Sequence, residues 1–256
     1  FDNIYYLWTI IILLCMQKIC IIIAMQAEAK PLIERYGLQN IEGFFGTAPT
    51  ELYQGIIAGK ELNVVTLGKQ HGYDLVGCES AAMATTLAIN ALHPDMIVNA
   101  GTCGAFKAYG AEVGDVYLGE GSVIFHDRHV DNDPYGVQSI GNYPLYNSKQ
   151  IAADLGLKLG RCSTGSSFDL DDKDFEVLKR EGGQLIDMEA GAIAFVASVF
   201  KTPLICIKCV SNIIDTGKDK SENSFSDNMK NVCKTLGDAC TKLIQYLFVD
   251  QPTLFY

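Results

Sequence analysis

The sequence has no excess of positive charge. Of its 256 residues, 20 are Lys or Arg and 30 are Asp or Glu, and the formal net charge is −10. Proteins that bind nucleic acid usually present a basic surface, so this balance argues against a nucleic-acid partner. The chain also lacks internal repeats and a Gly- or Pro-rich linker. With 48% hydrophobic residues it can bury one large core, and we expect a single domain.

The nine cysteines lack the spacing of a structural zinc site. Cys206 and Cys209 form a C-x-x-C pair, but no second pair lies at zinc-finger distance. Cys20 and others stand inside apolar runs, which is typical of buried, reduced thiols in a cytoplasmic protein. The segment from His126 to His129 has no cysteine partner nearby, and we interpret it as part of a loop. We therefore predict a cytoplasmic protein without a metal site.

The first fifteen residues combine an apolar stretch with no basic residue. The stretch is too short for a confident membrane span, and a signal peptide would begin with basic residues. Met16 opens the run MQKICIIIAM, which looks like a protein start followed by a strand. We expect residues 1–15 to be an upstream extension, residues 16–250 to form the folded domain, and no membrane to be a partner. A membrane anchor is the competing interpretation.

Apolar runs that suit buried strands alternate with segments of helical pattern. Strands are expected at 19–24, 51–58, 61–67, 95–100, 115–125, 157–164, 184–187 and 203–210, and helices at 28–36, 80–92, 171–180, 189–200 and 225–247. Small residues predict a loop at 101–104, and Gly, Pro, Asn and Asp predict a long one at 126–149. This alternation predicts a single α/β domain with a central mixed, mostly parallel sheet flanked by helices.

Polar residues gather where four of the predicted strands end, at 24–28, 99–104, 186–190 and 208–212. In open α/β sheets, ligands bind outside the carboxyl ends of strands. Each segment alone is a weak signal, because Glu28 can be an ordinary acid of a helix first turn and Gly101–Gly104 an ordinary tight turn. The four segments together predict a small-molecule site.

Five motifs carry a resemblance to a known family. They are AMQAEA (24–29), NAGTCGAF (99–106), VGDVYLGEGSVIFHDR (113–128), STGSSFD (163–169) and DMEAGAIAFVA (187–197). The chain resembles the 5′-methylthioadenosine/S-adenosylhomocysteine nucleosidases, in their plant-type branch, from about Met16 to Leu247. The resemblance implies the nucleoside phosphorylase fold, a homodimer, and hydrolysis of the bond between adenine and a 5′-thioribose without cofactor or metal.

The resemblance also assigns roles to residues. Such a reaction passes through an oxocarbenium-like state, which needs a base for water, an anchor for the sugar and help for the leaving purine. Glu28 is the implied general base, and Glu189 the implied ligand of the ribose 2′- and 3′-hydroxyls. The implied substrate-binding residues are Val76, Thr102, Cys103, Gly104, Phe168, Asp169, Met188, Ser211 and Phe225. Among these, Met188 suits an ordinary core position equally well.

Asn212 departs from the family pattern, which has an Asp that protonates N7 of adenine. An Asn side chain cannot act as an acid, and general acid catalysis contributes roughly 10²- to 10⁴-fold in rate. Asp215 follows at the wrong spacing to replace it. Three alternatives stay open: a slower adenine nucleosidase, a nucleosidase or phosphorylase for 6-oxopurine nucleosides such as inosine, and a non-catalytic nucleoside-binding or storage protein.

Phosphorylases of the same fold use phosphate in place of water, and their phosphate sites rely on arginine. This chain has four arginines, at positions 35, 128, 161 and 180, all away from the strand ends. Asn99 stands where the phosphorylase pattern has an arginine before the glycine-containing segment. Lys69, which is expected in a solvated loop, is the cation that would change this conclusion if it reached the site. We therefore expect water to be the nucleophile.

Overall fold

A computed structural model describes residues 16–130, 134–216 and 218–249, and the side chains of residues 216–227 are left aside. The predicted extension at 1–15 lies outside this range. The helices are α2 (Gln26–Tyr36), α3 (Cys78–Leu92), α4 (Tyr135–Ile140), α5 (Lys149–Leu155), α6 (Asp172–Glu181), α7 (Ala190–Phe200) and α8 (Lys218–Phe248), with 3₁₀ turns at Lys107–Tyr109 and Ile214–Thr216. None of the helices within these ranges has the length and apolar character to cross a lipid bilayer.

One large mixed sheet forms the centre of the molecule. Its strands are β1 (Lys18–Ile23), β2 (Gln39–Asn40), β3 (Glu51–Ile57), β4 (Lys60–Thr66), β7 (Met96–Ala105), β8 (Val116–Gly119), β9 (Ser122–Phe125), β10 (Tyr143–Pro144), β11 (Lys158–Gly160), β12 (Cys162–Thr164), β13 (Leu185–Asp187) and β14 (Leu204–Ile213). Strands β4, β1, β7 and β14 lie in this order and pair in parallel. Short strands β5 (Lys69–Gln70) and β6 (Tyr73–Asp74) form a separate hairpin.

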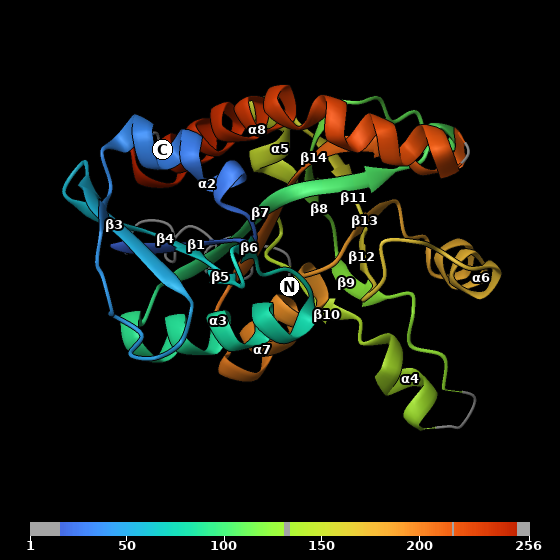
Figure 1. Ribbon diagram of the computed structural model, residues 1–256, viewed down its shortest axis with the longest axis horizontal. Helices are drawn as coiled ribbons and strands as arrows, with labels where there is room; N and C mark the ends of the chain where they lie inside the picture. The colour runs from blue at the N-terminus through green and yellow to red at the C-terminus, as the bar shows by residue number, and fades with distance from the viewer. Residues whose placement is uncertain (1–15, 131–133, 217, 250–256) are drawn as a thin grey trace, which may run out of the picture.

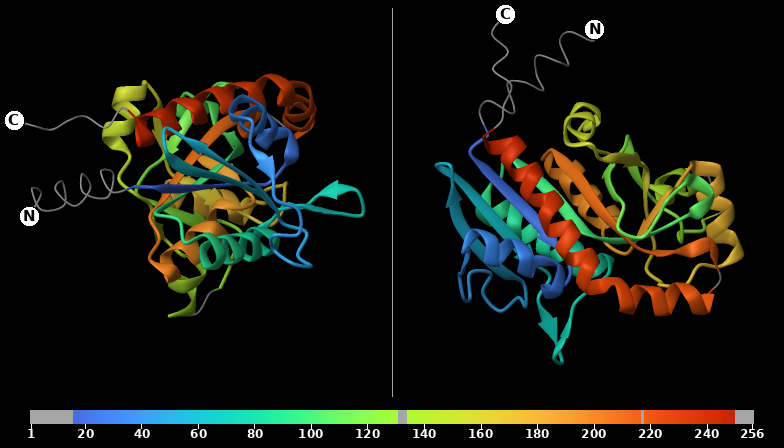
Figure 2. Two further views of the ribbon diagram at one scale, coloured as in Figure 1. Left: turned by 90° about the vertical axis from the view of Figure 1, so that its left-hand side faces the viewer. Right: turned by 90° about the horizontal axis from the view of Figure 1, so that it is seen from above.

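Helices cover both faces of this sheet. In Figure 1, α2, α5 and α8 lie along one face, and α3 and α7 lie along the other. The long helix α8 crosses its face diagonally (Figure 2, right). Strand β1 shows why its sequence is continuously apolar: Cys20 and Ile22 pack into the cluster under α3 and α7, whereas Ile19, Ile21 and Ile23 pack into the cluster under α2 and α8.

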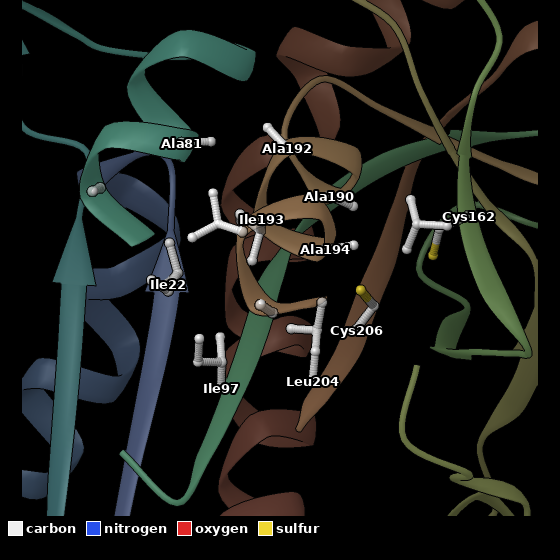
Figure 3. Packing of buried hydrophobic residues seen from close by; sticks show 14 of the residues in the cluster. Ile22, Ala81, Ile97, Cys162, Ala190, Ala192, Ile193, Ala194, Leu204 and Cys206 are labelled. Carbon is white, nitrogen blue, oxygen red and sulfur yellow. The ribbon is translucent and has the colours of Figure 1, made fainter. Parts of the chain in front are cut away.

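Small side chains let α7 lie close to the sheet. Figure 3 shows Ala190, Ile193 and Ala194 of this helix facing Leu204 and Cys206 of strand β14. An alanine side chain adds little bulk, so the helix backbone can approach the strands closely while the core stays filled. The eight cysteines within the described ranges are all buried and unpaired, as the sequence predicted.

The predicted loop at 101–104 is wrong, because these residues continue strand β7. The glycine residues in this segment allow neighbouring groups to lie close to the strand. A Cβ atom on Gly104 would lie 2.5 Å from Cδ1 of Ile214, which no side chain could tolerate without movement. The carboxyl-terminal half of β7 therefore stays hydrogen-bonded to β14 and forms the floor of a cavity.

Other differences concern the bounds of elements. The predicted strand at 115–125 is divided into β8 and β9, because Gly121 takes a positive φ of 69° and interrupts the extended backbone between them. The predicted strand at 157–164 is likewise divided into β11 and β12, the long loop at 126–149 contains α4 and β10, and α8 begins before residue 225. The alternation of strands and helices, and the mixed sheet, are confirmed.

Candidate active site

A cavity of about 270 Å³ opens where β1, β7, β13 and β14 carry their polar residues. Small-molecule sites usually measure about 300 to 1,000 Å³, so this cavity suits a compact ligand. The structure brings most of the predicted site residues to its wall: Glu28, Val76, Thr102, Cys103, Gly104, Phe168, Met188, Glu189, Ser211 and Asn212. Asp169 lies outside this lining. Phe225 belongs to the part of α8 whose side chains are not described.

Glu28 lies in the first turn of α2 and is 2% exposed. Its Oε1 accepts a hydrogen bond from the backbone N–H of Thr102 at 2.7 Å, and its Oε2 accepts one from Met25 N–H at 3.2 Å. Burial raises the pKa of Glu28, while these hydrogen bonds and the positive charge of Lys208 lower it. The side chain is thus both a helix-capping acid and a fixed carboxylate in the cavity wall, and a raised pKa makes it a better base.

Glu189 precedes α7 and faces the same cavity. Its Oε1 accepts the backbone N–H of Gly77 at 2.8 Å, which ties the start of α3 to the start of α7. Burial, followed by the negative charge of Asp187, raises the pKa of Glu189 to about 7. Two carboxylates, the buried Glu28 and the half-buried Glu189, therefore share one cavity, and each is oriented by a backbone N–H.

Lys208 and Asp187 are cavity residues that sequence reasoning missed. Lys208 Nζ lies 2.6 Å from Asp187 Oδ2, and both side chains are almost completely buried. Asp187 also accepts hydrogen bonds from Thr164 Oγ1 at 2.5 Å and from Ala190 N–H at 2.9 Å. The sequence feature that could have identified this pair is the single lysine within the otherwise apolar run 204–210, because a charge buried in a strand requires a partner.

A β-bulge sets the positions of Ser211 and Asn212. The register of β14 against β7 shifts between Val210 and Asn212, so Ser211 is an extra residue in the pair. Ser211 Oγ lies 2.8 Å from Asn212 Oδ1 and 3.1 Å from the carbonyl oxygen of Cys103. Asn228 of α8 donates to the carbonyl of Ser211 at 3.1 Å. The bulge thus turns both polar side chains toward the cavity within a strand.

Asp215 does not replace an acid at this position. Its carboxylate accepts the backbone N–H groups of Lys107 at 2.8 Å and Ala108 at 3.0 Å, at the start of a 3₁₀ turn. The side chain therefore caps a turn and is not part of the cavity lining. The expectation that its spacing is wrong agrees with this geometry.

Cations other than Lys208 do not line the cavity. Arg35 pairs with Asp238 on the surface, Arg180 pairs with Glu181, and Arg128 lies 3.4 Å from the ring centre of Phe125. Lys69 lies on the β5–β6 hairpin, exposed, with Asp74 at 3.9 Å. Arg161 donates to Asn142 at 2.7 Å. The described part of the chain thus brings no arginine to the cavity.

The histidines at 126–129 also lie outside the cavity. His126 is buried, with Nδ1 3.0 Å from Ser163 Oγ, and His129 pairs with Asp174 at 3.3 Å. His129, Asp171 and Asp174 lie close enough together to hold a cation, but both carboxylates are already used in the capping box at the start of α6. Acidic groups with local partners of this kind are ordinary helix caps.

Comparison with known proteins matches residues 18–245 to the model of the phosphorylase superfamily. A 5′-methylthioadenosine nucleosidase of Arabidopsis thaliana is 36% identical over 90% of this chain and 87% of its own length, and a 5′-methylthioadenosine/S-adenosylhomocysteine nucleosidase of the same plant is 37% identical over 90% and 91%. The chain belongs to this nucleosidase family. The apo structure of Arabidopsis 5′-methylthioadenosine nucleosidase superposes with a TM-score of 0.87 at 35% identity, over 91% of this chain and 96% of that one.

The raised pKa of Glu189 in this nucleosidase-family chain predicts a pH-dependent stability. The pKa of Glu189 is near 4.5 in the unfolded chain and about 7 in the folded protein. Ionisation of this side chain therefore destabilises the fold, and the destabilisation is absent at pH 4 and increases between these two pKa values. Glu189→Gln should therefore be more stable than wild type by about 1 to 3 kcal/mol at pH 8, since one pKa unit corresponds to about 1.4 kcal/mol.

Urea denaturation of both proteins at pH 4, 6 and 8 measures this difference. At pH 4 the side chain of Glu189 is protonated in both the folded and the unfolded state. Its ionisation should therefore contribute nothing to the difference in unfolding free energy between the two proteins at this pH. A stability difference that stays constant from pH 4 to pH 8 would contradict the raised pKa of Glu189.

Proposed function

We propose that this chain is a purine nucleosidase that hydrolyses 5′-methylthioadenosine or S-adenosylhomocysteine and releases adenine, without cofactor or metal. The observation that carries the proposal is the pair of carboxylates on the wall of one cavity, the buried Glu28 and the half-buried Glu189. Relatives that are 36 to 37% identical over most of their length are named for these substrates. A storage or binding protein would have no need to bury two carboxylates whose ionisation opposes folding.

In this proposal the two carboxylates both act on the ribose side of the reacting bond. Glu28 removes a proton from water, and its raised pKa favours that step. Glu189 accepts hydrogen bonds from the ribose 2′- and 3′-hydroxyls. Both negative charges stabilise the positive charge that develops on the sugar. Met188, adjacent to Glu189 on the cavity wall, packs against the ribose.

Water is the nucleophile that the cavity favours. Phosphate would need arginine or another free cation, and the described lining contains only Lys208, which is paired with Asp187. Asn99 of β7 is buried at the cavity, and its Oδ1 has no hydrogen-bond partner in the described structure. A carbonyl oxygen of this kind can accept a hydrogen bond from water but repels the oxygens of a phosphate ion.

Asn212 is compatible with an adenine substrate and predicts a slower reaction. Its Oδ1 faces the hydroxyl of Ser211 at 2.8 Å, which directs the amide NH₂ group away from Ser211. Such a group donates a hydrogen bond to N7 of adenine but cannot transfer a proton to it. Phe168, exposed at the cavity, is placed to stack on the purine ring, and Val76 borders the space left for the 5′-substituent.

We place the enzyme in the cytoplasm and expect it to be a homodimer. Eight buried, unpaired cysteines suit a reducing compartment. Apolar side chains are exposed on α3 and α7, on the face opposite α8 (Figure 1): Met83, Phe195, Val199 and Phe200. Val76, also exposed, connects this face to the cavity. A second copy on this face would cover the apolar surface and close the 5′-substituent region.

The proposed reaction predicts release of adenine from methylthioadenosine or adenosylhomocysteine without phosphate. Glu28→Gln should lower kcat/KM by at least about 10²-fold, because the amide cannot accept the proton of water. Chromatography of the free base measures this, with adenosine and inosine as further substrates, each with and without phosphate.

Base release from inosine alone would assign Asn212 to 6-oxopurine recognition and contradict the adenine substrate. Release that requires phosphate would make the chain a phosphorylase. A wild-type protein that releases no base from any of the four nucleosides would contradict an enzymatic function.

Replacing Asn212 by Asp should raise kcat for methylthioadenosine by about 10²- to 10⁴-fold, because the carboxylic acid can protonate N7 as the bond breaks. KM should change much less, since both side chains can hydrogen-bond N7. Ser211→Ala, which removes only the hydroxyl that faces Asn212, is the matched control and should not raise kcat. An Asp variant with unchanged kcat would show that leaving-group protonation does not limit this enzyme.

The expected dimer predicts that Phe195→Glu or Val199→Glu produces monomers, because a charge in a buried apolar interface is unfavourable. Light scattering coupled to size-exclusion chromatography measures the mass. Ile56→Glu, at an exposed apolar position on strand β3, is the control and should leave the mass unchanged. A wild-type protein of 28.0 kDa in solution would contradict the dimer.

A further inference from the structure

Lys208 is the one basic residue in the described cavity lining, and its side chain is 2% exposed. It lies on β14 between two apolar residues, Ile207 and Cys209. A Cβ atom on Gly101 would lie 3.6 Å from Lys208 Nζ and 3.6 Å from Glu28 Oε1. The ammonium group and the carboxylate therefore border the same glycine, and the methyl group of an alanine there would contact both of them.

The charges around this ammonium group do not balance. Asp187 of β13, Glu189 before α7 and Glu28 of α2 contribute three carboxylates at the cavity, against one lysine. The thiols that face the lysine or Glu28 come from four elements: Cys103 of β7, Cys162 of β12, Cys206 and Cys209 of β14, and Cys233 and Cys240 of α8. Burial raises the pKa of the Cys209, Cys233 and Cys240 thiols, so these thiols stay neutral at physiological pH and do not change the charge balance at the cavity.

We propose that Lys208 is a positioning residue of the active site, which supplies the positive charge that keeps Glu28 ionised and ties the turn carrying Glu189 to strand β14. This proposal rests on the proposed function, in which Glu28 is the base. It assigns to Lys208 a role beyond neutralising Asp187.

The tether follows from the hydrogen bonds of Asp187. The same Oδ2 atom accepts from Lys208 Nζ at 2.6 Å and from the backbone N–H of Ala190 at 2.9 Å. Met188 and Glu189 lie in the turn between Asp187 and Ala190. Ser211 lies on β14, three residues after Lys208. The ammonium group of Lys208 thus fixes the ribose side of the cavity, with Met188 and Glu189, relative to the purine side, with Ser211.

Lys208 also acts electrostatically on the carboxylates of the cavity. The charge of Lys208 lowers the pKa of both Glu28 and Glu189, against the effect of burial. Asp187 raises the pKa of Glu189, whereas the effect of Lys208 on Glu28 is a direct one between two charges that border Gly101. The effect of Lys208 on Glu28 should therefore persist when Asp187 is made neutral.

Three variants separate these roles. Lys208→Met removes the charge at similar length, and Lys208→Arg retains it. The double variant Asp187→Asn/Lys208→Met replaces the ion pair by two neutral groups, so neither partner of the pair is left as an unpaired buried charge even if Lys208→Met alone fails to fold. Circular dichroism at each pH establishes which variants are folded.

The first readout is kcat/KM for methylthioadenosine from pH 4.5 to 9. In Lys208→Met and in the double variant, the acid limb of the profile should move upward by about one pH unit, which is a tenfold loss at the low-pH end. Lys208→Arg should keep the wild-type limb. A double variant whose acid limb coincides with that of the wild type would overturn the proposal, because Lys208 would then serve only to neutralise Asp187.

The second readout does not need turnover. Infrared difference titration of each protein against its own Glu28→Gln counterpart follows the carboxyl band of Glu28 directly. The midpoint should move upward in the double variant and stay in place in Lys208→Arg. If the wild type releases no base, the proposed function fails, and this titration still supports or overturns the effect of Lys208 on Glu28.

Discussion

The buried ion pair of Lys208 and Asp187 is the interaction on which the site depends. Three carboxylates at one closed cavity would repel one another, and each loses hydration on burial. One ammonium group at 2.6 Å from Asp187 reduces that cost and leaves the excess negative charge on Glu28 and Glu189. An excess of negative charge is what an oxocarbenium-like sugar requires, so the imbalance that opposes folding is also the means of stabilising the reacting state.

The fold makes this arrangement possible through the length of two central strands. Strands β7 and β14 are each ten residues long, and in their carboxyl-terminal halves β7 consists of small residues and β14 contains a bulge. Small residues in β7 allow both Glu28 and Lys208 to approach Gly101 closely. Backbone N–H groups that would be free in a loop are held in place by the sheet, and Thr102 N–H is thereby directed at Glu28. A rigid donor of this kind needs no reorganisation during the reaction.

Much of this could be predicted from sequence, because the underlying signals are local. The apolar run at 19–24 predicts a strand buried on both faces, and the rule that ligands bind at strand ends leads to Glu28 and Glu189. The pairing of Lys208 with Asp187 could not be predicted, since it joins residues on strands that meet only in the folded sheet. Gly101–Gly104 illustrates a second limit: glycines have the same local signature in a turn and in a strand that other groups approach closely.

Asn212 cannot act as an acid, but its neutral side chain suits the electrostatics of this cavity. An aspartate at this buried position would be a fourth carboxylate near a single lysine, and it could assist a leaving purine only in its protonated form. The amide is neutral at every pH and keeps a donor in place, with its oxygen facing Ser211 at 2.8 Å. The hydrogen bond to the purine is thus independent of pH, but the proton must come from elsewhere. In the proposed mechanism, charge stabilisation at the sugar by Glu28 and Glu189 would then carry a larger share of catalysis. The charge of Lys208 would therefore matter more here than in a chain with an acid at position 212.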